Sequence, residues 1–524
     1  DLLDGQQGSY YAGYADTASG DIAIGEQAMY AGPTGGGNYA IGRYSMMDAN
    51  AGSTSLSSNS NIAIGQSAMG GTWADAASSY NVAIGNNTMD AALNGALYNM
   101  AMGYNALGAL TSGDSNVAIG HGAGYSVTTG GNNILIGRAA GDAHTALEGT
   151  VLIGHFAGSA INNNNSNYSV MIGYSAGQAV TSGIGNNLIG YYAGRYLSTN
   201  GYNTMFGTET GAHMNGSSNT FIGYYTGRGS SNSAPYGNGN FNTAVGRQAL
   251  ETVFSGSYST AIGYVAGRYA TGSYNTFIGS QAGLGGTTSA PYSSGVHNVA
   301  LGYNALAAFT TGEQNVAIGS SAASNLTTGV YNTIVGNGAQ SGTTGVNNTM
   351  IGRAAGASMT TAQKITAVGA TTFNYLTVAT DSTAIGYDAG EYATGSYNTF
   401  VGSEAGKGGT TGAPYSSGES NVAVGKSAFA GFTTGYSNTV MGVNAGDAIT
   451  TGYENTIIGQ AAGTNLVGGN NNVMIGQLAG YATTGVSGTV IIGEQAAYTG
   501  NMTSDADGTV SIGSGAGKNI TSGI

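Results

Sequence analysis

The stretch Asn455-Thr456-Ile457-Ile458-Gly459 decides the fold, because copies of it recur along almost the whole chain. Written as N-x-apolar-apolar-G, the pattern occurs 28 times, from Ile24-Gly25 to Ile512-Gly513. The residue before the glycine is apolar in all 28 copies, and the first position is Asn in 20 of them. Because self-similarity outweighs the several domains that 524 residues would otherwise suggest, we expect one repeat architecture.

The spacing of the copies selects the type of repeat. The glycine that ends each copy, called here the anchor glycine, follows the previous one by 16 or 17 residues in 19 of 27 intervals. Helical repeats need about 30 residues or more, and glycine and asparagine at this density disfavour helices. One turn of a β-solenoid fits about 17 residues. The sequence therefore predicts an all-β, parallel β-solenoid (β-roll) of about 28 coils, stacked about 4.8 Å apart.

Composition agrees with an ordered repeat and excludes several functions. The chain has 95 glycines and only 7% charged residues, but 41% hydrophobic residues at fixed positions are enough to close a core. A net charge of −13 without a basic cluster argues against nucleic-acid binding. The absence of cysteine excludes disulfides and thiolate metal sites. No apolar run approaches the roughly 18 residues of a membrane span.

The pattern also sets the domain boundaries. Residues 1–20 lack it and are predicted to be an N-terminal cap or lead-in, followed by one continuous solenoid domain over residues 21–524. Four intervals stretch to 23 residues, and three of these contain Ala-Pro-Tyr. Because proline lacks the N–H that a central strand needs, we expect looped insertions near residues 229–241, 285–297 and 408–420.

Each position of the repeat has an expected structural role. Stacked Asn side chains can form an amide ladder between coils, the apolar residues form the strand, and the anchor glycine supplies a bend without a Cβ. Representative ladder residues are Asn116, Asn315, Asn438, Asn455, Ile119, Ile318, Ile458, Gly120, Gly319 and Gly459.

The two apolar positions of each strand point to opposite faces, because side chains alternate along a strand. A strand that is apolar on both faces has to be covered on both. We assign the residue directly before the glycine to the inside of the coil. The residue two before the glycine is assigned to an outer face that packs against another copy or another layer, and its self-association residues are Phe221, Phe277, Phe400, Met474 and Ile491.

Tyrosines directly after an anchor glycine form a further regular column. Regular aromatic rows can stack sugar rings, and the candidates for such glycan stacking are Tyr174, Tyr191, Tyr224 and Tyr264. The competing interpretation is that these rings cover strand edges and pack on one another.

The motif resembles two kinds of known repeat. Asn116-Val117-Ala118-Ile119-Gly120 is similar to the N-x-A-I-G repeats in the head domains of YadA-like trimeric autotransporter adhesins, which form a left-handed parallel β-roll. The longer form, N-T-x-I-G-x-x-A-G-x-x-x-T-T-G, also resembles repeat arrays of bacteriophage tail fibres. The resemblance covers residues 21–524 and implies a left-handed, trimeric fibre, although the adhesin heads use a shorter coil.

Motifs that would carry chemistry are better explained by the repeat. Gly173-Tyr174-Ser175-Ala176-Gly177 matches the G-x-S-x-G nucleophile elbow, but every copy is G-x-x-A-G here and Ser occupies a variable position. The five histidines fall in different columns or loops. Paired acids, as a glycan-cleaving tailspike would need, are not apparent, because Glu209, Glu251, Glu391 and Glu404 are scattered singly. No catalytic, cofactor-binding or metal-binding residue is predicted.

The sequence therefore predicts a non-enzymatic, extracellular structural fibre or adhesin on a cell or virion surface. Its predicted partners are other copies of itself, as a homotrimer or a head-to-tail filament, and surface glycans. A bacteriophage tail-fibre shaft and a glycan-cleaving tailspike remain the alternatives.

Overall fold

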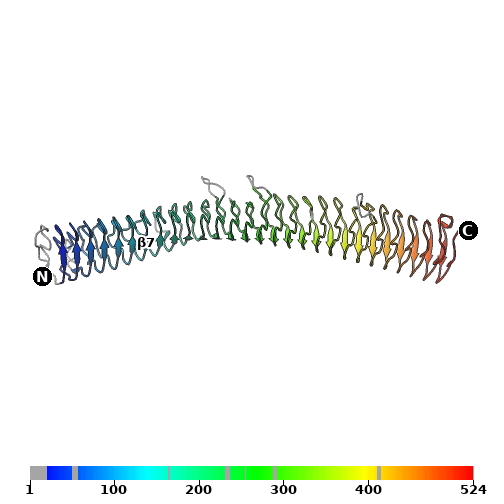
Figure 1. Cartoon of the computed structure of the whole chain (residues 1–524), viewed down its shortest axis with the longest axis horizontal. Coiled ribbons are helices and arrows are strands. Elements are labelled where there is room, and N and C mark those ends of the chain that lie inside the picture. The colour runs from blue at the N-terminus through cyan, green and yellow to red at the C-terminus, as the bar shows by residue number, and fades with distance from the viewer. Residues whose placement is uncertain are drawn as a thin grey trace. The chain divides into compact units, whose positions relative to one another are not determined.

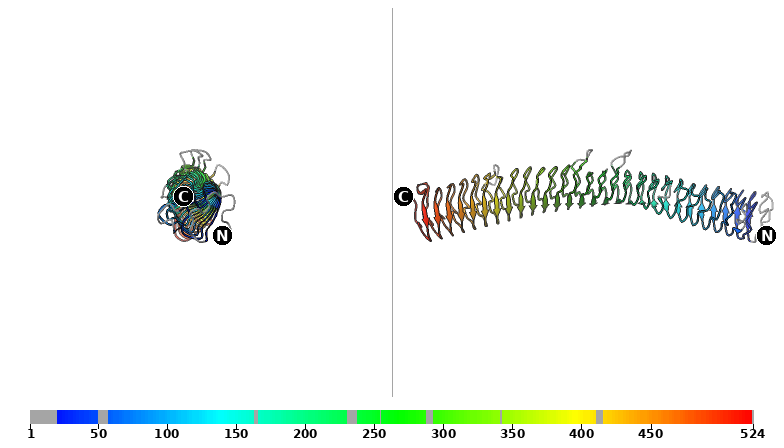
Figure 2. Two further views of the ribbon diagram at one scale, coloured as in Figure 1. Left: turned by 90° about the vertical axis from the view of Figure 1, so that its left-hand side faces the viewer. Right: turned by 180° about the vertical axis from the view of Figure 1, so that it is seen from behind.

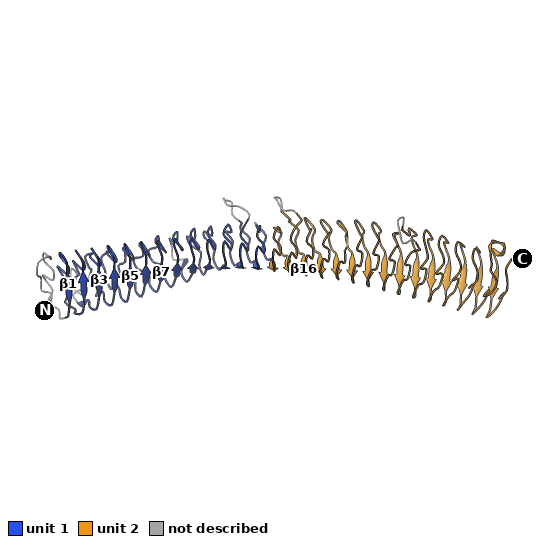
Figure 3. Cartoon of the chain, viewed as in Figure 1, with its two compact units in different colours: residues 1–259 blue, residues 260–524 orange. Residues whose placement is uncertain are grey.

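The computed structural model describes residues 20–49, 57–162, 166–229, 237–253, 255–286, 292–340, 342–409 and 415–522. Within them the chain is all-β: a parallel β-solenoid of 28 strands, each three residues long, with one 3-10 helix, η3 (Ser504–Ala506). The predicted fold class is confirmed. Contacts divide the chain into two compact units, residues 1–259 and 260–524, which are described separately (Figure 3). A single continuous domain therefore stays a prediction, and the predicted cap lies, apart from Gly20, outside the described residues.

The first unit carries 13 of the strands, which appear as the blue to green arrows of Figure 1. They are β1 (Ile22–Ile24), β2 (Tyr39–Ile41), β3 (Ile62–Ile64), β4 (Val82–Ile84), β5 (Met100–Met102), β6 (Val117–Ile119), β7 (Ile134–Ile136), β8 (Val151–Ile153), β9 (Val170–Ile172), β10 (Asn187–Ile189), β11 (Thr204–Phe206), β12 (Thr220–Ile222) and β13 (Thr243–Val245).

The second unit carries the other 15 strands. They are β14 (Thr260–Ile262), β15 (Thr276–Ile278), β16 (Val299–Leu301), β17 (Val316–Ile318), β18 (Thr333–Val335), β19 (Thr349–Ile351), β20 (Thr366–Val368), β21 (Thr383–Ile385), β22 (Thr399–Val401), β23 (Val422–Val424), β24 (Thr439–Met441), β25 (Thr456–Ile458), β26 (Val473–Ile475), β27 (Val490–Ile492) and β28 (Val510–Ile512).

Consecutive strands within each unit pair in parallel and in register, so that equivalent residues of successive coils lie side by side (Figure 2). We call one coil a rung. In β24 and β25, for example, Met441 pairs with Ile458, and both precede an anchor glycine. The register also holds across the 23-residue intervals, where β12 pairs with β13, β15 with β16 and β22 with β23. Within the three predicted insertions, residues 230–236, 287–291 and 410–414 lie outside the described residues.

The middle residue of each strand points into the coil. It is buried in 27 of the 28 strands, and Ala23 of β1 is half-buried. The prediction that this position faces outward is therefore wrong. The five predicted self-association residues are fully buried inside the solenoid: Phe221, Phe277, Phe400, Met474 and Ile491.

The residue before each anchor glycine faces outward instead, and none of the 28 is buried. We call these residues the anchor row. In the first unit it comprises Ile24, Ile41, Ile64, Ile84, Met102, Ile119, Ile136, Ile153, Ile172, Ile189, Phe206, Ile222 and Val245; in the second, Ile262, Ile278, Leu301, Ile318, Val335, Ile351, Val368, Ile385, Val401, Val424, Met441, Ile458, Ile475, Ile492 and Ile512. The predicted ladder residues Ile119, Ile318 and Ile458 belong to it and are half-buried.

Side-chain volume inside the coil explains why the large strand residues point inward. The fourth residue after an anchor glycine also enters the core, opposite the strand. Where the strand supplies Phe221, that residue is Gly227, and a Cβ there would lie 2.5 Å from the phenylalanine ring. Where the strand supplies Ala423, it is Phe429, which is fully buried. In these two rungs a large residue at one position thus faces a small residue at the other, as close packing of the interior requires.

The Asn column forms the predicted ladder, and its amide groups are buried. Asn438 donates from Nδ2 to Oδ1 of Asn421 (3.0 Å) and to the carbonyl of Gly452 (2.9 Å). Its own Oδ1 accepts from the backbone N–H and from Nδ2 of Asn455, at 3.1 and 3.0 Å. Each amide thus satisfies a turn carbonyl of the following rung as well as its neighbours, which stabilises buried polar groups.

Other residues in this column show what the ladder requires. Ser382 still accepts from the backbone N–H of Asn398 at 3.1 Å through its hydroxyl. The backbone N–H of Ile365 donates to Oδ1 of Asn348 at 2.9 Å. The isoleucine side chain has no polar group that could bond to the next rung. Small polar residues therefore continue the ladder, and Ile365 interrupts it.

The anchor glycines are required by close contact between rungs. Gly120 has a φ of +134°, a region that side chains rarely adopt, and a Cβ there would lie 2.7 Å from the carbonyl carbon and oxygen of Gly137. Gly319 and Gly459 have the same conformation, with φ of +129° and +136°. Glycine at this position permits the backbones of successive rungs to touch.

Replacing an anchor glycine should therefore open its rung. We expect Gly120→Ala to cost about 3 kcal/mol or more of local stability, because it combines backbone strain with overlap on Gly137. Gly122→Ala is the matched control in the same turn: its φ is also positive, at +65°, but nothing lies within 4 Å of the added Cβ. Its cost should stay near 1–2 kcal/mol. Hydrogen exchange of β6 and β7 measures both, and equal effects would contradict the contact argument.

Removing one ladder amide should loosen the rungs on both sides. Asn332→Ala leaves the backbone N–H of Asn348 and the carbonyl of Gly345 without their partners, at a cost of about 1–3 kcal/mol. Asn337→Ala changes an exposed asparagine five residues later in the same rung and should have little effect. Thermal unfolding and local hydrogen exchange test the difference. A control variant as unstable as Asn332→Ala would refute the ladder's role.

Candidate functional site

Aromatic and charged side chains gather on one flank of the first unit, beside the strands β9 to β12. We call this the aromatic flank, made by Tyr174, Tyr191, Tyr192, Arg195, Tyr196, Glu209, His213, Tyr224, Tyr225 and Arg228. All ten follow an anchor glycine by one, two, five or six residues. The rungs place these positions on one side of the coil, so residues far apart in sequence become neighbours.

Three of the four tyrosines predicted to stack on glycans lie here. Tyr174, Tyr191 and Tyr224 are 43%, 46% and 43% exposed. The rings of Tyr174 and Tyr191 stack across one rung, with centroids 5.6 Å apart and planes within 20°. Tyr264 occupies the equivalent position in a rung of the second unit and is 47% exposed. Tyr174 and Tyr191 thus pack on each other, and all four tyrosines keep close to half of their surface accessible.

A second pair of tyrosines supports the first from the next position in the turn. Tyr192 packs on Tyr191 with centroids 4.0 Å apart, and Tyr225 on Tyr224 at 3.9 Å. Both have a φ of +57°, in the left-handed region. This backbone conformation directs two consecutive side chains to the same side, which adjacent residues of a strand cannot do.

Two arginines lie against these rings. The Arg195 guanidinium carbon is 4.2 Å from the ring centroid of Tyr192 and 5.0 Å from that of Tyr196. Arg228 lies 4.6 Å from the Tyr225 centroid and pairs with Glu209 at 2.8 Å. Cation–π contact fixes the planar guanidinium groups in one orientation. The site thus presents charge on a rigid aromatic support.

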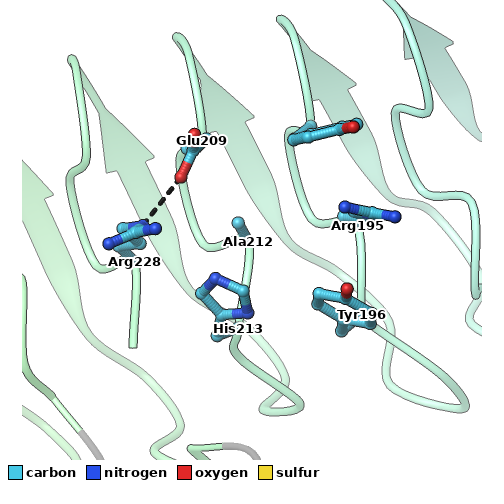
Figure 4. A pocket seen from close by; sticks show the side chains of 7 residues that line it. Arg195, Tyr196, Glu209, Ala212, His213 and Arg228 are labelled. Atoms are coloured by element: carbon cyan, nitrogen blue, oxygen red, sulfur yellow. Dashed lines mark hydrogen bonds and ion pairs between the residues drawn. The ribbon is translucent and has the colours of Figure 1, made fainter. Parts of the chain in front are cut away.

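These side chains line a shallow pocket of about 230 Å³ that spans three rungs (Figure 4). Figure 4 shows Arg195 and Tyr196 on one rung, Glu209, Ala212 and His213 on the next, and Arg228 on a third. The pocket is lined by Tyr192, Arg195, Tyr196, Glu209, Ala212, His213 and Arg228. Its walls are aromatic, and both guanidinium groups border it.

The pocket environment perturbs several titratable groups. A hydrogen bond to Tyr224, then burial and the Glu209 carboxylate, raise the pKa of Tyr225 to about 12. A hydrogen bond to Tyr192 is the main cause that raises the pKa of Tyr191. Burial, followed by the positive charge of Arg228, lowers the pKa of His213, whose ring stacks on Tyr196 at 5.2 Å. The raised pKa of Tyr225 and the lowered pKa of His213 therefore keep both groups uncharged beside the arginines at neutral pH.

Sequence reasoning found the exposed tyrosines but missed the cations. The missed residues occupy positions that vary from one repeat to the next, so the repeat pattern does not single them out: Arg195, Arg228, Tyr192 and Tyr196. The available signal was the position of arginine five residues after the anchor glycine in Gly194-Arg195-Tyr196 and again in Gly227-Arg228.

The remaining motifs take structural positions. Ser175 of the G-x-S-x-G match is buried in a turn that no helix follows, and its backbone N–H donates to the carbonyl of His155 at 2.8 Å. His121 contacts the ring of Tyr104 at 5.3 Å. Within the described part of the chain, no three His, Cys, Asp or Glu side chains are grouped so as to hold a metal ion.

Two of the four glutamates predicted to be scattered singly, Glu391 and Glu404, lie at one cluster, whereas the described partners of Glu209 and Glu251 are not acids. Glu209 pairs with Arg228, and Glu251 accepts from Gln248 at 3.0 Å. In the second unit, Nζ of Lys407 lies 3.2 Å from Asp388, 3.4 Å from Glu391 and 3.6 Å from Glu404. Burial disfavours this ammonium, but Asp388 and Glu391 outweigh that effect and raise the pKa of Lys407. The acids at Lys407 come from two different rungs, and stacking of the rungs brings them close although they are separated in sequence.

Comparisons with known proteins add no family to these observations. No protein-family model matches the chain, and no curated protein matches its sequence significantly. In the described ranges, no helix has the length and hydropathy needed to cross a lipid bilayer.

The lowered pKa of His213 predicts a pH-dependent local stability. Because His213 protonates more readily in the unfolded chain, its contribution is complete above the unfolded pKa near 6.5 and is lost as the pH falls toward the folded value. Hydrogen exchange of residues 204–222, corrected for its intrinsic pH dependence, should therefore accelerate between pH 7 and pH 5. His213→Gln should remove this acceleration, whereas His121→Gln, at an exposed histidine, should retain it. Acid sensitivity that survives in His213→Gln would contradict the assignment.

Proposed function

We propose that this protein is a non-enzymatic, extracellular structural fibre or adhesin whose copies associate through the anchor row. The observation that carries the proposal is the exposure of that row: every rung presents one Ile, Val, Leu, Met or Phe outward, beside a first strand residue that is also unburied. A continuous apolar stripe of this kind marks an interaction surface in a soluble protein.

Periodicity selects the occupant of this surface. The row repeats once per rung, at the strand spacing of about 4.8 Å. A globular partner would match it over a few rungs only, whereas another copy of the same chain carries the same repeat over its full length. The occupant is therefore a second copy. Three copies per fibre is the arrangement that resemblance to trimeric adhesin heads favours, and a head-to-tail filament is the alternative.

The proposed work of the fibre is reach and surface contact. The constant positions of each rung serve to stack it on its neighbours. The strand centres fill the core, the asparagines form the ladder, and the glycines allow the backbones of successive rungs to approach closely. The aromatic flank is left as a surface for binding glycans, because its tyrosines stay accessible. A bacteriophage tail-fibre shaft is supported by the same features, and the gene sequence that follows Ile524 would distinguish it from a cell-surface protein.

The association test uses charge placed on or beside the anchor row. The double variant Ile318→Lys/Ile458→Lys puts two cations into the row at half-buried positions, so each solenoid should still fold while the assembly dissociates. Ser320→Lys/Gln460→Lys adds the same charge to exposed positions of the same rungs and should leave the assembly intact. Light scattering of the purified protein should give about three times the 51.8 kDa chain mass for the wild type.

Two outcomes contradict the proposal. One is a wild-type chain that remains at 51.8 kDa at every concentration. The other is equal behaviour of the two double variants: if both dissociate, added charge rather than loss of the apolar row is responsible, and if both stay assembled, the anchor row does not hold the copies together.

A glycan-cleaving tailspike is the second candidate function, and the cluster at Lys407 favours it. Glu391 and Glu404 both lie within hydrogen-bonding or ion-pairing range of one ammonium, so their carboxylates are within about 7 Å of each other, compatible with a glycosidase acid pair. Polysaccharide depolymerisation that is abolished by Glu391→Gln and Glu404→Gln, but not by Glu313→Gln at an exposed site, would replace the non-enzymatic proposal.

A further inference from the structure

Arg195 differs from the other arginine of the pocket in its charge environment. Arg228 is neutralised by Glu209 at 2.8 Å, but Arg195 forms no ion pair within the described residues. Its guanidinium is held by the rings of Tyr192 and Tyr196 alone, and its Nε is buried without a hydrogen-bond partner. A guanidinium has five N–H donors, and a buried donor without a partner costs free energy. An anion in the pocket would supply the charged partner that this guanidinium lacks.

The surroundings restrict what kind of anion fits. The pocket holds about 230 Å³, smaller than the roughly 300–1,000 Å³ of pockets that enclose drug-sized ligands. Its aromatic walls suit the apolar C–H face of a single ring, and its openness on the flank lets a chain continue beyond it. A bare inorganic ion would leave the tyrosine and imidazole walls without contacts.

The direction of the site adds a third restriction. The pocket spans three rungs, and the exposed ring of Tyr191 lies on the first of them, beside Tyr192. Tyr174 stacks on Tyr191 and continues the flank on the preceding rung. A polymer lying along the solenoid would thus meet the rings of Tyr174 and Tyr191 on adjacent rungs beside the pocket that takes its acidic unit.

We propose that the pocket binds a uronic acid unit of an acidic polysaccharide, with the sugar carboxylate on the Arg195 guanidinium and the sugar ring against Tyr192, Tyr196 and His213. A carboxylate matches the planar donors of arginine in a bidentate geometry. Arg228 stays paired with Glu209 and contributes positive potential. The inference rests on the proposed adhesive function for its biological meaning, but it needs no self-association.

The test measures binding of the full-length chain to polyglucuronate by calorimetry, with a neutral glucan of the same length as the comparison polymer. The wild type should bind polyglucuronate and leave the glucan unbound, and free glucuronate should bind at least tenfold more weakly than the polymer. Arg195→Gln should weaken polyglucuronate binding at least tenfold. Tyr196→Leu should weaken it severalfold by removing one wall of the pocket.

Arg43→Gln is the matched control. Arg43 also lies on a tyrosine ring, 4.4 Å from Tyr44, but it already pairs with Glu26 at 3.0 Å and lies outside the pocket. This variant should bind within twofold of the wild type. Inorganic sulfate at the same concentration of charge should not displace the polymer, because it makes no ring contacts.

The inference is overturned by any of three results: no binding of polyglucuronate by the wild type, equal binding of the neutral glucan, or equal losses in Arg195→Gln and Arg43→Gln. Hydrogen exchange over residues 187–228 confirms that Arg195→Gln stays folded. The oligomeric state of the same samples is read by light scattering. A monomeric wild type that binds polyglucuronate would overturn self-association alone, and a trimer that ignores it would overturn the pocket alone.

Discussion

The whole structure depends on direct contact between the backbones of successive rungs. Three-residue strands are too short to form stable sheets by themselves, so each rung acquires its hydrogen bonds from the rungs on either side. The anchor glycines allow that approach, since a Cβ at Gly120 would meet the carbonyl of Gly137 at 2.7 Å. The Asn ladder then donates hydrogen bonds to turn carbonyls that lie outside the strands, such as those of Gly130 and Gly452. Stability of this kind is cooperative between neighbours and grows with the number of rungs.

The repeat itself made the fold predictable. Spacing, glycine and asparagine columns were visible in the sequence and correspond to strands, bends and the ladder in the structure. What the pattern did not reveal was which apolar position faces the core. Phe221 and Ile222 are both apolar, so alternation alone assigns them to opposite faces without deciding which face is inside. The size of Gly227, across the core from Phe221, decides it. Which strand position faces the core can therefore be read only by comparing the strand position with the position across the core, and not from either position alone.

The aromatic flank was only partly predictable, for a related reason. The tyrosines after the anchor glycines share one column and could be found by counting. The pocket combines residues that follow three different anchor glycines, and its character comes from neighbours such as Glu209 and Arg228, 19 residues apart in sequence. In a repeat protein, binding residues are found at positions that vary between repeats, because the constant positions are needed for stacking the rungs.

The surfaces of each rung therefore have separate tasks. The core and ladder columns hold the coil together, the exposed anchor row is the surface proposed for other copies, and the variable turn positions form the pocket proposed for a ligand. The most direct test of this account is an electron cryo-microscopy map of the purified 524-residue chain. The account predicts strands repeating every 4.7–4.9 Å, with the anchor row of each copy buried against another copy. Single solenoids with that row facing solvent, or coils without the strand repeat, would contradict it.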